Sequence, residues 1–421
     1  MRLLVLGGQL QGTEITYLAK EAEWEVTVID RNEDALASRL CDHFVCMDVL
    51  EAGPELFRSF DLVLPAFEDL GSLERAQRLA EEAEVPFAFD LQAFTLSLSK
   101  TRSNHFLEEF GIRIPGTIDG DSGSIEPSSG AAPGAILTEQ GYIVKPDCSS
   151  GSKGVQRYNH IDAAIARIQE QPSEGLFGQV FLDGPIYSIE VVCDYEHVRP
   201  FMVTEVVVNA DYDCFRINAP ADIPSGLADE IEALSLKVGK ALHMKGIFDL
   251  EMVFHDSRLY VLEIDARMPS QTPIAVYHAS GINLFEELAQ VFLAQTCQES
   301  QAESNATPLS CLEASSTGTA HVVLQHVLAE RRESPAQSQT AEALVTTESV
   351  VHIIGEGQLI EAPPLVEQNG FFSADVALVG KDTKRNSFYA TLVAKDESGN
   401  LAARKMDRIV EELASKVAAD D

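Results

Sequence analysis

The sequence lacks an apolar run long enough to cross a membrane, and its cysteines form no recognisable pairs. The seven cysteines, at positions 41, 46, 148, 193, 214, 297 and 311, are odd in number and none lies in a Cys-x-x-Cys motif. This distribution indicates neither a disulfide framework nor a zinc site, and it fits a reducing compartment. The opening segment MRLLVLGGQLQG is too short and has the wrong flanks for a signal peptide. We therefore expect a cytoplasmic protein with no membrane partner.

Basic residues are scarce. The chain has 31 lysines and arginines against 66 acidic residues, a net charge of −35. Such a surface repels the phosphates of nucleic acids and anionic lipids, so we expect no nucleic-acid partner. The acidity could serve solubility or a salty cell interior, or it could attract a cationic amino-acid substrate. An ATP site in this chain must build its own positive pocket.

The 421 residues are enough for more than one domain. Residues 1–100 alternate between apolar strands (RLLVLGG, EVTVID, DLVLPAF, VPFAFD) and helical segments (TEITYLAKEAE, SLERAQRLAEEAE). Strands and helices that alternate in this way predict a parallel sheet with right-handed crossovers. We therefore predict a Rossmann-like N-terminal domain.

The rest of the chain mixes helices with antiparallel strands. We predict helices in RSNHFLEEFG, DAAIARIQEQ, NLFEELAQVFLAQ and ARKMDRIVEELASKV, and a loop at 120–135. We predict strands in YIVKP, GQVFLDGPIYSIEVVCD, AHVVLQHV, SVVHII, FSADVALVG and FYATLVA, and a hairpin in IFDLEMVF and LYVLEID. Residues 297–318 are polar and predict a connection. The fold class is therefore α/β plus α+β.

The glycine turn GGQLQG at 7–12 is a broken dinucleotide fingerprint. Gln9 stands where a glycine must let the backbone approach a pyrophosphate, although Asp30 lies where a ribose-binding acid would be. NAD binding is therefore disfavoured. Two interpretations stay open: the N–H groups of this turn hold an anion such as a substrate carboxylate, or the glycines only let helix and strand pack.

A second candidate is Lys145 with the loop that follows it. A lysine within an apolar strand is costly unless its charge has a partner. The small residues of the loop leave backbone N–H groups free to fold around phosphate oxygens. The loop is not a Walker A motif, and alone it would be an ordinary loop. Together with Lys145 it favours a phosphate site that includes Ser149, Ser150, Gly151, Ser152 and Lys153.

The third candidate is a set of carboxylates in the predicted hairpin. Alternation places Asp249 and Glu251 on one face of the first strand, and Glu263 and Asp265 on one face of the second. If Glu251 lies opposite Glu263, then Asp249 lies opposite Asp265. Four carboxylates then repel one another unless divalent cations bind, and Mg²⁺ with ATP phosphates suits such oxygen ligands. A solvated polar face is the alternative.

Two further details belong to this hairpin. Strict alternation would place Leu259 and Val261 on the same face as the two acids of the second strand. Arg267, two residues beyond Asp265, can reach a transferring phosphate by a bidentate contact.

Taken in order, these segments resemble the ATP-grasp superfamily along essentially the whole chain. The resemblance implies a Rossmann-like domain at 1–100, a small lid domain at 101–178 and a larger catalytic domain with an antiparallel sheet at 179–421. It also implies that ATP lies between two antiparallel sheets and that two Mg²⁺ ions are cofactors.

The resemblance assigns roles at matching positions. Lys100 and Lys145 match the family's two phosphate-binding lysines, and Arg267 with Lys145 would be catalytic. Glu251 and Glu263 match the metal-bridging acids, and Asp265 stands where the family often has Asn. Ile186 departs from the ribose-binding acid of several relatives, which puts ribose contacts in doubt. The residues implied to contact ATP are Lys100, Lys145, Ser149, Ser150, Gly151, Ser152, Lys153, Gln179, Val180, Phe181 and Leu182.

Within the superfamily, GGxLQG, LPAFED, the IVKP segment, GPIYSIEV and EIDARMPSQTP are similar to the 3-methylornithine–L-lysine ligases of pyrrolysine biosynthesis. The resemblance implies an acyl phosphate on 3-methyl-D-ornithine, which the ε-amine of L-lysine attacks. Small amino acids would then be the partners, and a homodimer is a candidate assembly. The candidate substrate contacts are Gln9, Leu10, Gln11, Glu68, Ser188, Glu190 and Asp249; an ordinary exposed acid is the alternative for each carboxylate.

Three other functions stay open. A purine-type ATP-grasp enzyme acting on a ribonucleotide would need a basic pocket, for which RNEDALASRL offers only Arg31 and Arg39. A biotin-dependent carboxylase subunit would show bicarbonate-dependent ATPase activity. A nucleotide-binding regulator without catalysis would not need the metal-bridging acids.

Overall fold

The computed structural model describes residues 1–118, 125–126, 140–149, 151–170, 173, 175–300, 320–330, 344–346, 359–361, 374–382 and 387–419. Ser150, most of the loop at 120–135 and the strand predicted in SVVHII lie outside these residues. The chain forms two compact units. Unit 1 comprises Met1–Phe89, Phe215–Asp222 and Met268–Asp421, and unit 2 comprises Asp90–Cys214 and Ile223–Arg267. The predicted division at residues 100 and 178 stays a prediction.

A parallel sheet opens unit 1, as the alternating pattern predicts. Its order is β3 (His43–Cys46), β2 (Glu25–Asp30), β1 (Arg2–Leu6) and β4 (Leu62–Pro65), and all the pairs are parallel. Strands β1 and β4 are almost wholly apolar and buried, as expected where both faces of a parallel sheet are covered. Helix α1 (Leu10–Glu21) connects β1 to β2, α2 (Pro54–Phe57) precedes β4, and α3 (Leu70–Ala83) follows β4.

Two details of this sheet differ from the prediction. Strand β3 was not predicted, because it is short and its residues are only partly buried. The predicted strand VPFAFD contributes one isolated bridge, between Phe87 and Val63.

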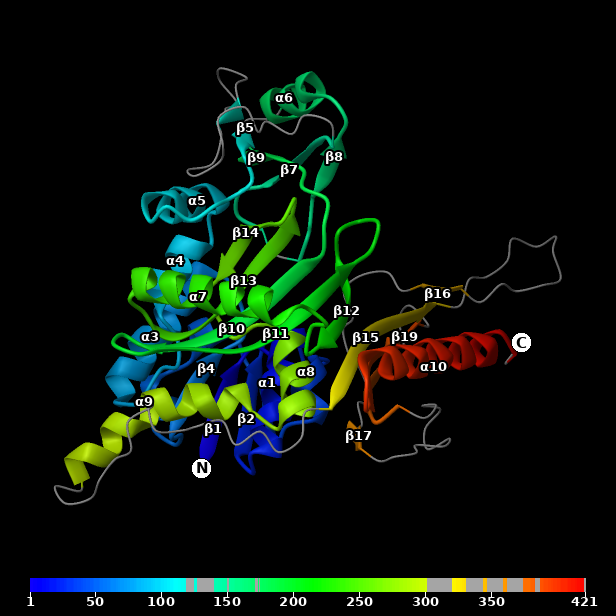
Figure 1. The fold of residues 1–421 in the computed structure, drawn as a ribbon. Helices are drawn as coiled ribbons and strands as arrows, with labels where there is room; N and C mark the ends of the chain where they lie inside the picture. The colour runs from blue at the N-terminus through cyan, green and yellow to red at the C-terminus, as the bar shows by residue number, and fades with distance from the viewer. Residues whose placement is uncertain are drawn as a thin grey trace. The chain divides into compact units, whose positions relative to one another are not determined.

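Unit 1 also contains an antiparallel sheet. Its strands follow the order β12 (Cys214–Ala219), β15 (His321–Glu330), β19 (Ser387–Asp396), β18 (Val376–Asp382) and β17 (Leu359–Glu361), and β16 (Leu344–Thr346) pairs with β15. Helix α10 (Gly399–Ala419) packs on β15 and β19 through Ala402, Met406 and Ile409 (Figure 1). Helices α8 (Thr272–Ser280) and α9 (Leu284–Ser300) complete the unit, and α9 continues through residues 297–300, which were predicted to be connection.

Unit 2 contains a small sheet covered by one helix. The order is β6 (Ile125–Glu126), β5 (Thr117–Ile118), β9 (Leu176–Val180), β7 (Tyr142–Pro146) and β8 (Gln156–Tyr158). Helix α6 (Ile161–Glu170) covers one face through a core that includes Tyr142, Val144 and Val180 (Figure 1). The opposite face carries the alternate residues Ile143, Lys145, Phe177 and Gln179.

The second sheet of unit 2 is antiparallel throughout, in the order β14 (Arg258–Asp265), β13 (Lys245–His255), β10 (Ile186–Asp194) and β11 (Val198–Val208). Helix α7 (Ser225–Leu242) packs on β10 and β11. Helices α4 (Leu91–Ser97) and α5 (Lys100–Glu109) contact β14. The predicted fold class is therefore confirmed, with a parallel N-terminal sheet and larger antiparallel sheets.

Candidate active site

The carboxylates of the β13–β14 hairpin pair as predicted. Glu251 lies opposite Glu263, and Asp249 lies opposite Asp265. A tight turn at Asp256 and Ser257, with φ values of 46° and 60°, starts the hairpin. A register shift between Glu251 and Met252 then sets the acids opposite one another. Strand β10 extends both rows. The first row is Ser188, Glu251 and Glu263, and the second row is Glu190, Asp249 and Asp265.

The predicted face of Leu259 and Val261 is wrong. A register shift in β14 adds one residue, Leu262, so that Val261 pairs with Met252 and Leu259 pairs with Phe254. Both apolar side chains therefore join the apolar face of the sheet. The bulge separates the apolar first part of β14 from its acidic last part. Simple alternation along the sequence could not reveal this change of face.

The two rows hold their charges at a cost. Burial, followed by the charges of Glu263 and Asp265, raises the pKa of Glu251 to about 7. Burial, followed by Asp265 and Glu251, raises the pKa of Asp249 well above its usual range. Asp249 is 7% exposed, and its Oδ1 accepts no hydrogen bond from the residues that the structure describes. A bound cation would relieve this repulsion.

The residues fit Mg²⁺ as part of an ATP complex. No three His, Cys, Asp or Glu side chains within the described ranges are already gathered to hold a metal ion. Mg²⁺ at an ATP site, however, commonly uses one or two carboxylates together with water and phosphate oxygens. The facing pair Glu251 and Glu263 is such a donor set.

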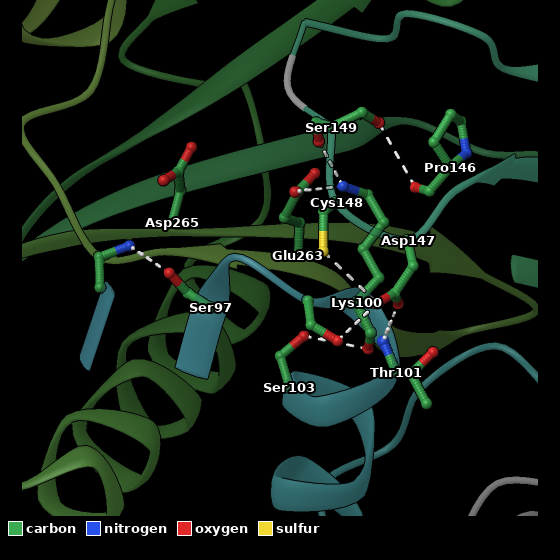
Figure 2. A network of polar contacts seen from close by, with 12 residues as sticks. Ser97, Lys100, Thr101, Ser103, Pro146, Asp147, Cys148, Ser149, Glu263 and Asp265 are labelled. Atoms are coloured by element: carbon green, nitrogen blue, oxygen red, sulfur yellow. Dashed lines mark hydrogen bonds and ion pairs between the residues drawn. The ribbon is translucent and has the colours of Figure 1, made fainter. Parts of the chain in front are cut away.

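Lys100 brings positive charge to the first row. It is the first residue of α5 and is 5% exposed. Its ammonium group lies 3.0 Å from Glu263 Oε1 and donates a hydrogen bond of 2.5 Å to the carbonyl of Ser149 (Figure 2). The lysine thus links the hairpin to the segment that follows β7.

Lys145 lies on β7, on the sheet face that α6 leaves open. Burial lowers the pKa of Lys145 to about 8, although Glu263 and Glu251 act in the opposite direction. On the same face, Gln179 is 4% exposed, and its Nε2 has no hydrogen-bond partner in the described part of the chain. This face therefore offers a half-buried cation and a buried polar donor.

The loop after β7 turns through left-handed backbone conformations. Gly151, Ser152 and Gly154 have φ values of 60°, 52° and 79°. Ser152 Oγ donates a hydrogen bond of 2.8 Å to the carbonyl of Tyr212, and Lys153 is exposed. The predicted contact at Ser150 lies outside the described residues.

At the end of β9 and just after it, two side chains point away from the open face of the small sheet. Val180 and Leu182 pack into the core beneath α6, so their side chains point away from the face that carries Lys145. The amide of Phe181 donates to the carbonyl of Gly141 at 2.9 Å. The guanidinium of Arg157 lies 3.9 Å from the centroid of the Phe181 ring. Nearby, Arg157 also lines a cavity of about 390 Å³ with residues 155–158 and 210–212.

Arg267 ends unit 2 beside the second row. Its guanidinium lies 2.7 Å from Asp265 Oδ2, and its side chain is 13% exposed. A guanidinium held by a carboxylate is oriented before a phosphate arrives. Its contact with a phosphate stays a prediction.

The predicted substrate residues of the N-terminal turn and Glu68 lie in unit 1. Asp30 Oδ2 accepts a hydrogen bond of 2.7 Å from Gly8 N–H, and a Cβ at Gly12 would lie 1.9 Å from the carbonyl oxygen of Gly7. Both contacts support the packing interpretation of these glycines. Gln11 donates to the carbonyl of Met268. Roles for Gln9, Leu10, Gln11 and Glu68 at the substrate stay predictions.

Sequence reasoning missed Asp147. It follows Lys145 by two residues, and its carboxylate accepts hydrogen bonds of 2.7 Å from Ser99 Oγ and from Thr101 N–H, on either side of Lys100. One signal was present in the sequence: Ser99 is a typical N-cap immediately before the helix that begins at Lys100. Its partner could not be found without the fold.

Comparison with known proteins agrees with this geometry. Residues 98–271 match the family model of the ATP-grasp domain. The chain is 32% identical over 296 residues to the 3-methyl-D-ornithine–L-lysine ligase of Methanosarcina acetivorans, covering 69% of this chain and 73% of that protein. It is 33% identical over 293 residues to the ligase of the same name from Methanosarcina barkeri, covering 69% and 73%.

A solved structure shows the same fold at low identity. The biotin carboxylase of Campylobacter jejuni superposes with a TM-score of 0.66 at 14% identity, covering 98% of this chain and 91% of that one. No helix in the described part of the chain is long and apolar enough to span a membrane. The chain belongs to the ATP-grasp superfamily, and it is a carboxylate–amine ligase.

Proposed function

We propose that this ligase joins the carboxylate of 3-methyl-D-ornithine to the ε-amine of L-lysine, with ATP as the phosphoryl donor. The observation that carries the proposal is the pair of buried carboxylates in the second row, Glu190 and Asp249. These acids exceed what a metal pair needs, and surplus buried negative charge suits substrates that carry extra ammonium groups. Two relatives at 32% and 33% identity are named for this substrate pair, which supports the choice.

ATP is proposed to lie against the open face of the small sheet. Lys145 and Lys100 would contact phosphates together with the loop Ser149–Lys153, and the backbone of residues 179–182 would meet the adenine. Glu251, Glu263 and Asp265 would hold two Mg²⁺ ions, which supply charge neutralisation to the phosphates when they are bound.

The first step is a phosphoryl transfer. A carboxylate oxygen of the ornithine attacks the γ-phosphorus, the bond to the β,γ-bridging oxygen breaks, and ADP leaves. Such a transfer needs positioning and charge stabilisation more than covalent help. Lys145 would hold the phosphate chain, and the guanidinium of Arg267, already oriented by Asp265, would stabilise the moving phosphoryl group.

The second step forms the amide. A neutral ε-amine attacks the acyl carbon, and the carbon–oxygen bond to phosphate breaks. Lysine's ε-amine has a reference pKa of about 10.4, so it must lose a proton to a carboxylate or water near the reacting atoms. Closure of the loop around Gly151 would exclude the water that hydrolyses acyl phosphates.

Substrate recognition is proposed for the second row and its neighbour. Glu190 is fully buried and Ser188 is 1% exposed, and Ser188 Oγ donates to Glu190 Oε1 at 3.4 Å. With Asp249 they would hold ammonium groups of the substrates, and Glu68 and residues 9–11 of unit 1 are the predicted further contacts. A cytoplasmic location and a homodimer remain predictions from the sequence.

The test is product formation. Purified protein with Mg-ATP is given single amino acids, then D-ornithine (standing in for its 3-methyl derivative) with L-lysine, and both ADP and product mass are recorded. ADP release matched to an ornithyl-lysine mass is expected, with none from Arg267→Met. ADP release only with bicarbonate and a ribonucleotide would replace the proposal with the purine-type carboxylase that the sequence left open.

A further inference from the structure

One residue, Asp147, accepts three hydrogen bonds from Lys100 and its two neighbours in the chain. Its carboxylate accepts from Ser99 Oγ and from Thr101 N–H, each at 2.7 Å. Its backbone carbonyl accepts from the N–H of Lys100 itself at 3.1 Å. Three consecutive residues at the start of α5 are therefore bonded to a single aspartate (Figure 2).

Lys100 is hydrogen-bonded at both of its ends to the segment that carries Asp147. The backbone of Lys100 is bonded to Asp147, and its ammonium group reaches the carbonyl of Ser149, two residues further along the same segment. Asp147 N–H in turn donates to the carbonyl of Gly175 at 2.8 Å, at the start of β9. The segment that carries Asp147 is thus fixed to the small sheet, and the start of α5 is fixed to that segment.

The charge of Asp147 suits its place. A carboxylate at a helix N-terminus accepts N–H groups that have no partner within the helix and interacts favourably with the helix dipole. Burial raises the pKa of Asp147, but the hydrogen bonds from Ser99 and Thr101 outweigh it and hold that pKa below its ordinary value. Asp147 is therefore present as the carboxylate on which the whole arrangement depends.

Asp147 is connected to both of the predicted phosphate-binding lysines. It follows Lys145 by two residues on one side and clamps the backbone of Lys100 on the other. Two lysines that bind one polyphosphate must keep a fixed separation, because a displacement of about 1 Å in such a site can cost up to roughly a hundredfold in rate.

From these contacts we infer that Asp147 is a positioning residue for nucleoside triphosphate binding: it holds Lys100 at the distance from Lys145 that the phosphates require, without touching the nucleotide itself. The inference rests on the proposed ATP site and deepens it. It assigns a function to a residue that none of the predicted contacts included.

The first experiment compares two capping aspartates in unit 2. Asp90 accepts from Ala93 N–H at 2.9 Å at the start of α4 and from Lys245 N–H at 3.0 Å, but it flanks no phosphate lysine. Asp147→Ala and Asp90→Ala are expected to lower the unfolding midpoint by similar amounts. Only Asp147→Ala should raise the Kd for ATP, by roughly tenfold, with the KM values of the amino acids unchanged.

The second experiment asks whether Asp147 acts through Lys100. In the background of Lys100→Met, Asp147→Ala should change the Kd for ATP by less than about twofold, because the group being positioned is already gone. Asp147→Asn keeps one acceptor for Thr101 N–H and should recover part of the lost affinity. If Lys100→Met binds too weakly to titrate, the comparison with Asp90→Ala and the Asn rescue decide the question.

The outcomes separate the two levels of the proposal. An unchanged Kd in Asp147→Ala, an equal loss in Asp90→Ala, or a full tenfold loss that persists without the Lys100 ammonium would overturn the positioning role. A wild-type protein that binds no ATP at all would overturn the proposed function, and the positioning role with it.

Discussion

The most informative perturbation of this site is the removal of one charge from the first row, by Glu251→Gln. Its carboxyl has a pKa near 7 in the folded chain because burial and the charges of Glu263 and Asp265 oppose ionisation. In the unfolded chain the same group titrates near its ordinary value of 4.5. A carboxyl whose folded pKa is raised does not change the free energy of unfolding below the unfolded pKa. Folding stability is then lost as the pH rises from 4.5 through 7.

The magnitude follows from this difference. A shift of one pKa unit corresponds to about 1.4 kcal/mol, so Glu251 destabilises the metal-free native state by at most about 3 kcal/mol at pH 8. Its side chain is only partly buried, and solvent screening reduces that value. Glutamine cannot ionise, so the metal-free Glu251→Gln protein should be the more stable one at pH 8 while losing ligase activity. Added Mg²⁺ should stabilise the wild type more than the variant.

The assay must report on unit 2. The single tryptophan, Trp24, lies in unit 1, so its fluorescence follows the wrong part of the chain. Hydrogen exchange of peptides from residues 245–265, at pH 8 in EDTA, follows the hairpin itself. We expect stronger protection in Glu251→Gln, by up to roughly a hundredfold. The control is Glu205→Gln, on the opposite face of the same sheet, which should change little. Weaker protection in Glu251→Gln than in the wild type would refute the reasoning.

Three further predictions concern the same site. Because Lys145 loses its proton as the pH rises through about 8, affinity for an ATP analogue without metal should fall about tenfold per pH unit above 8 in the wild type and stay flat in Lys145→Arg; a flat wild-type profile would contradict this. Glu190→Gln and Ser188→Ala should each raise the KM of an amino-acid substrate and leave that of ATP unchanged; unchanged amino-acid KM values in steady-state kinetics would exclude both contacts. Arg267→Lys should lower kcat by roughly a hundredfold with a similar KM for ATP, measured as ADP release; a change in KM alone would assign Arg267 to ground-state binding.

The hairpin shows how far local pattern can predict a site. Alternation could predict that Asp249 and Glu251 share a face and that Glu263 and Asp265 share a face, but a two-residue turn alone would set Glu251 opposite Leu262. The bulge at Leu262 could not be predicted, because an extra residue leaves no mark in the alternation around it. The predicted pairing of the acids therefore depends on the bulge, and for want of it Leu259 and Val261 were placed on the wrong face.

Contacts between distant segments were the other limit. The prediction of Lys100 as a phosphate residue came from family resemblance, and nothing local showed that Asp147 would bond to its backbone across 47 positions of sequence. In the same way, Asp30 could be expected near the glycine turn, but only the fold shows its carboxylate accepting from Gly8. Elements with strong periodicity, such as α3 and α10, were predictable, whereas the short β3 was not.

The most direct test of the proposed chemistry follows the oxygen of the activated carboxylate. D-ornithine with an ¹⁸O-labelled carboxylate is incubated with L-lysine, Mg-ATP and the enzyme, and the released phosphate is analysed by mass spectrometry. An acyl phosphate intermediate predicts one ¹⁸O atom in the phosphate for each amide formed, with ADP as the other product. Label in AMP, or amide formed with unlabelled phosphate, would contradict carboxylate activation by phosphoryl transfer.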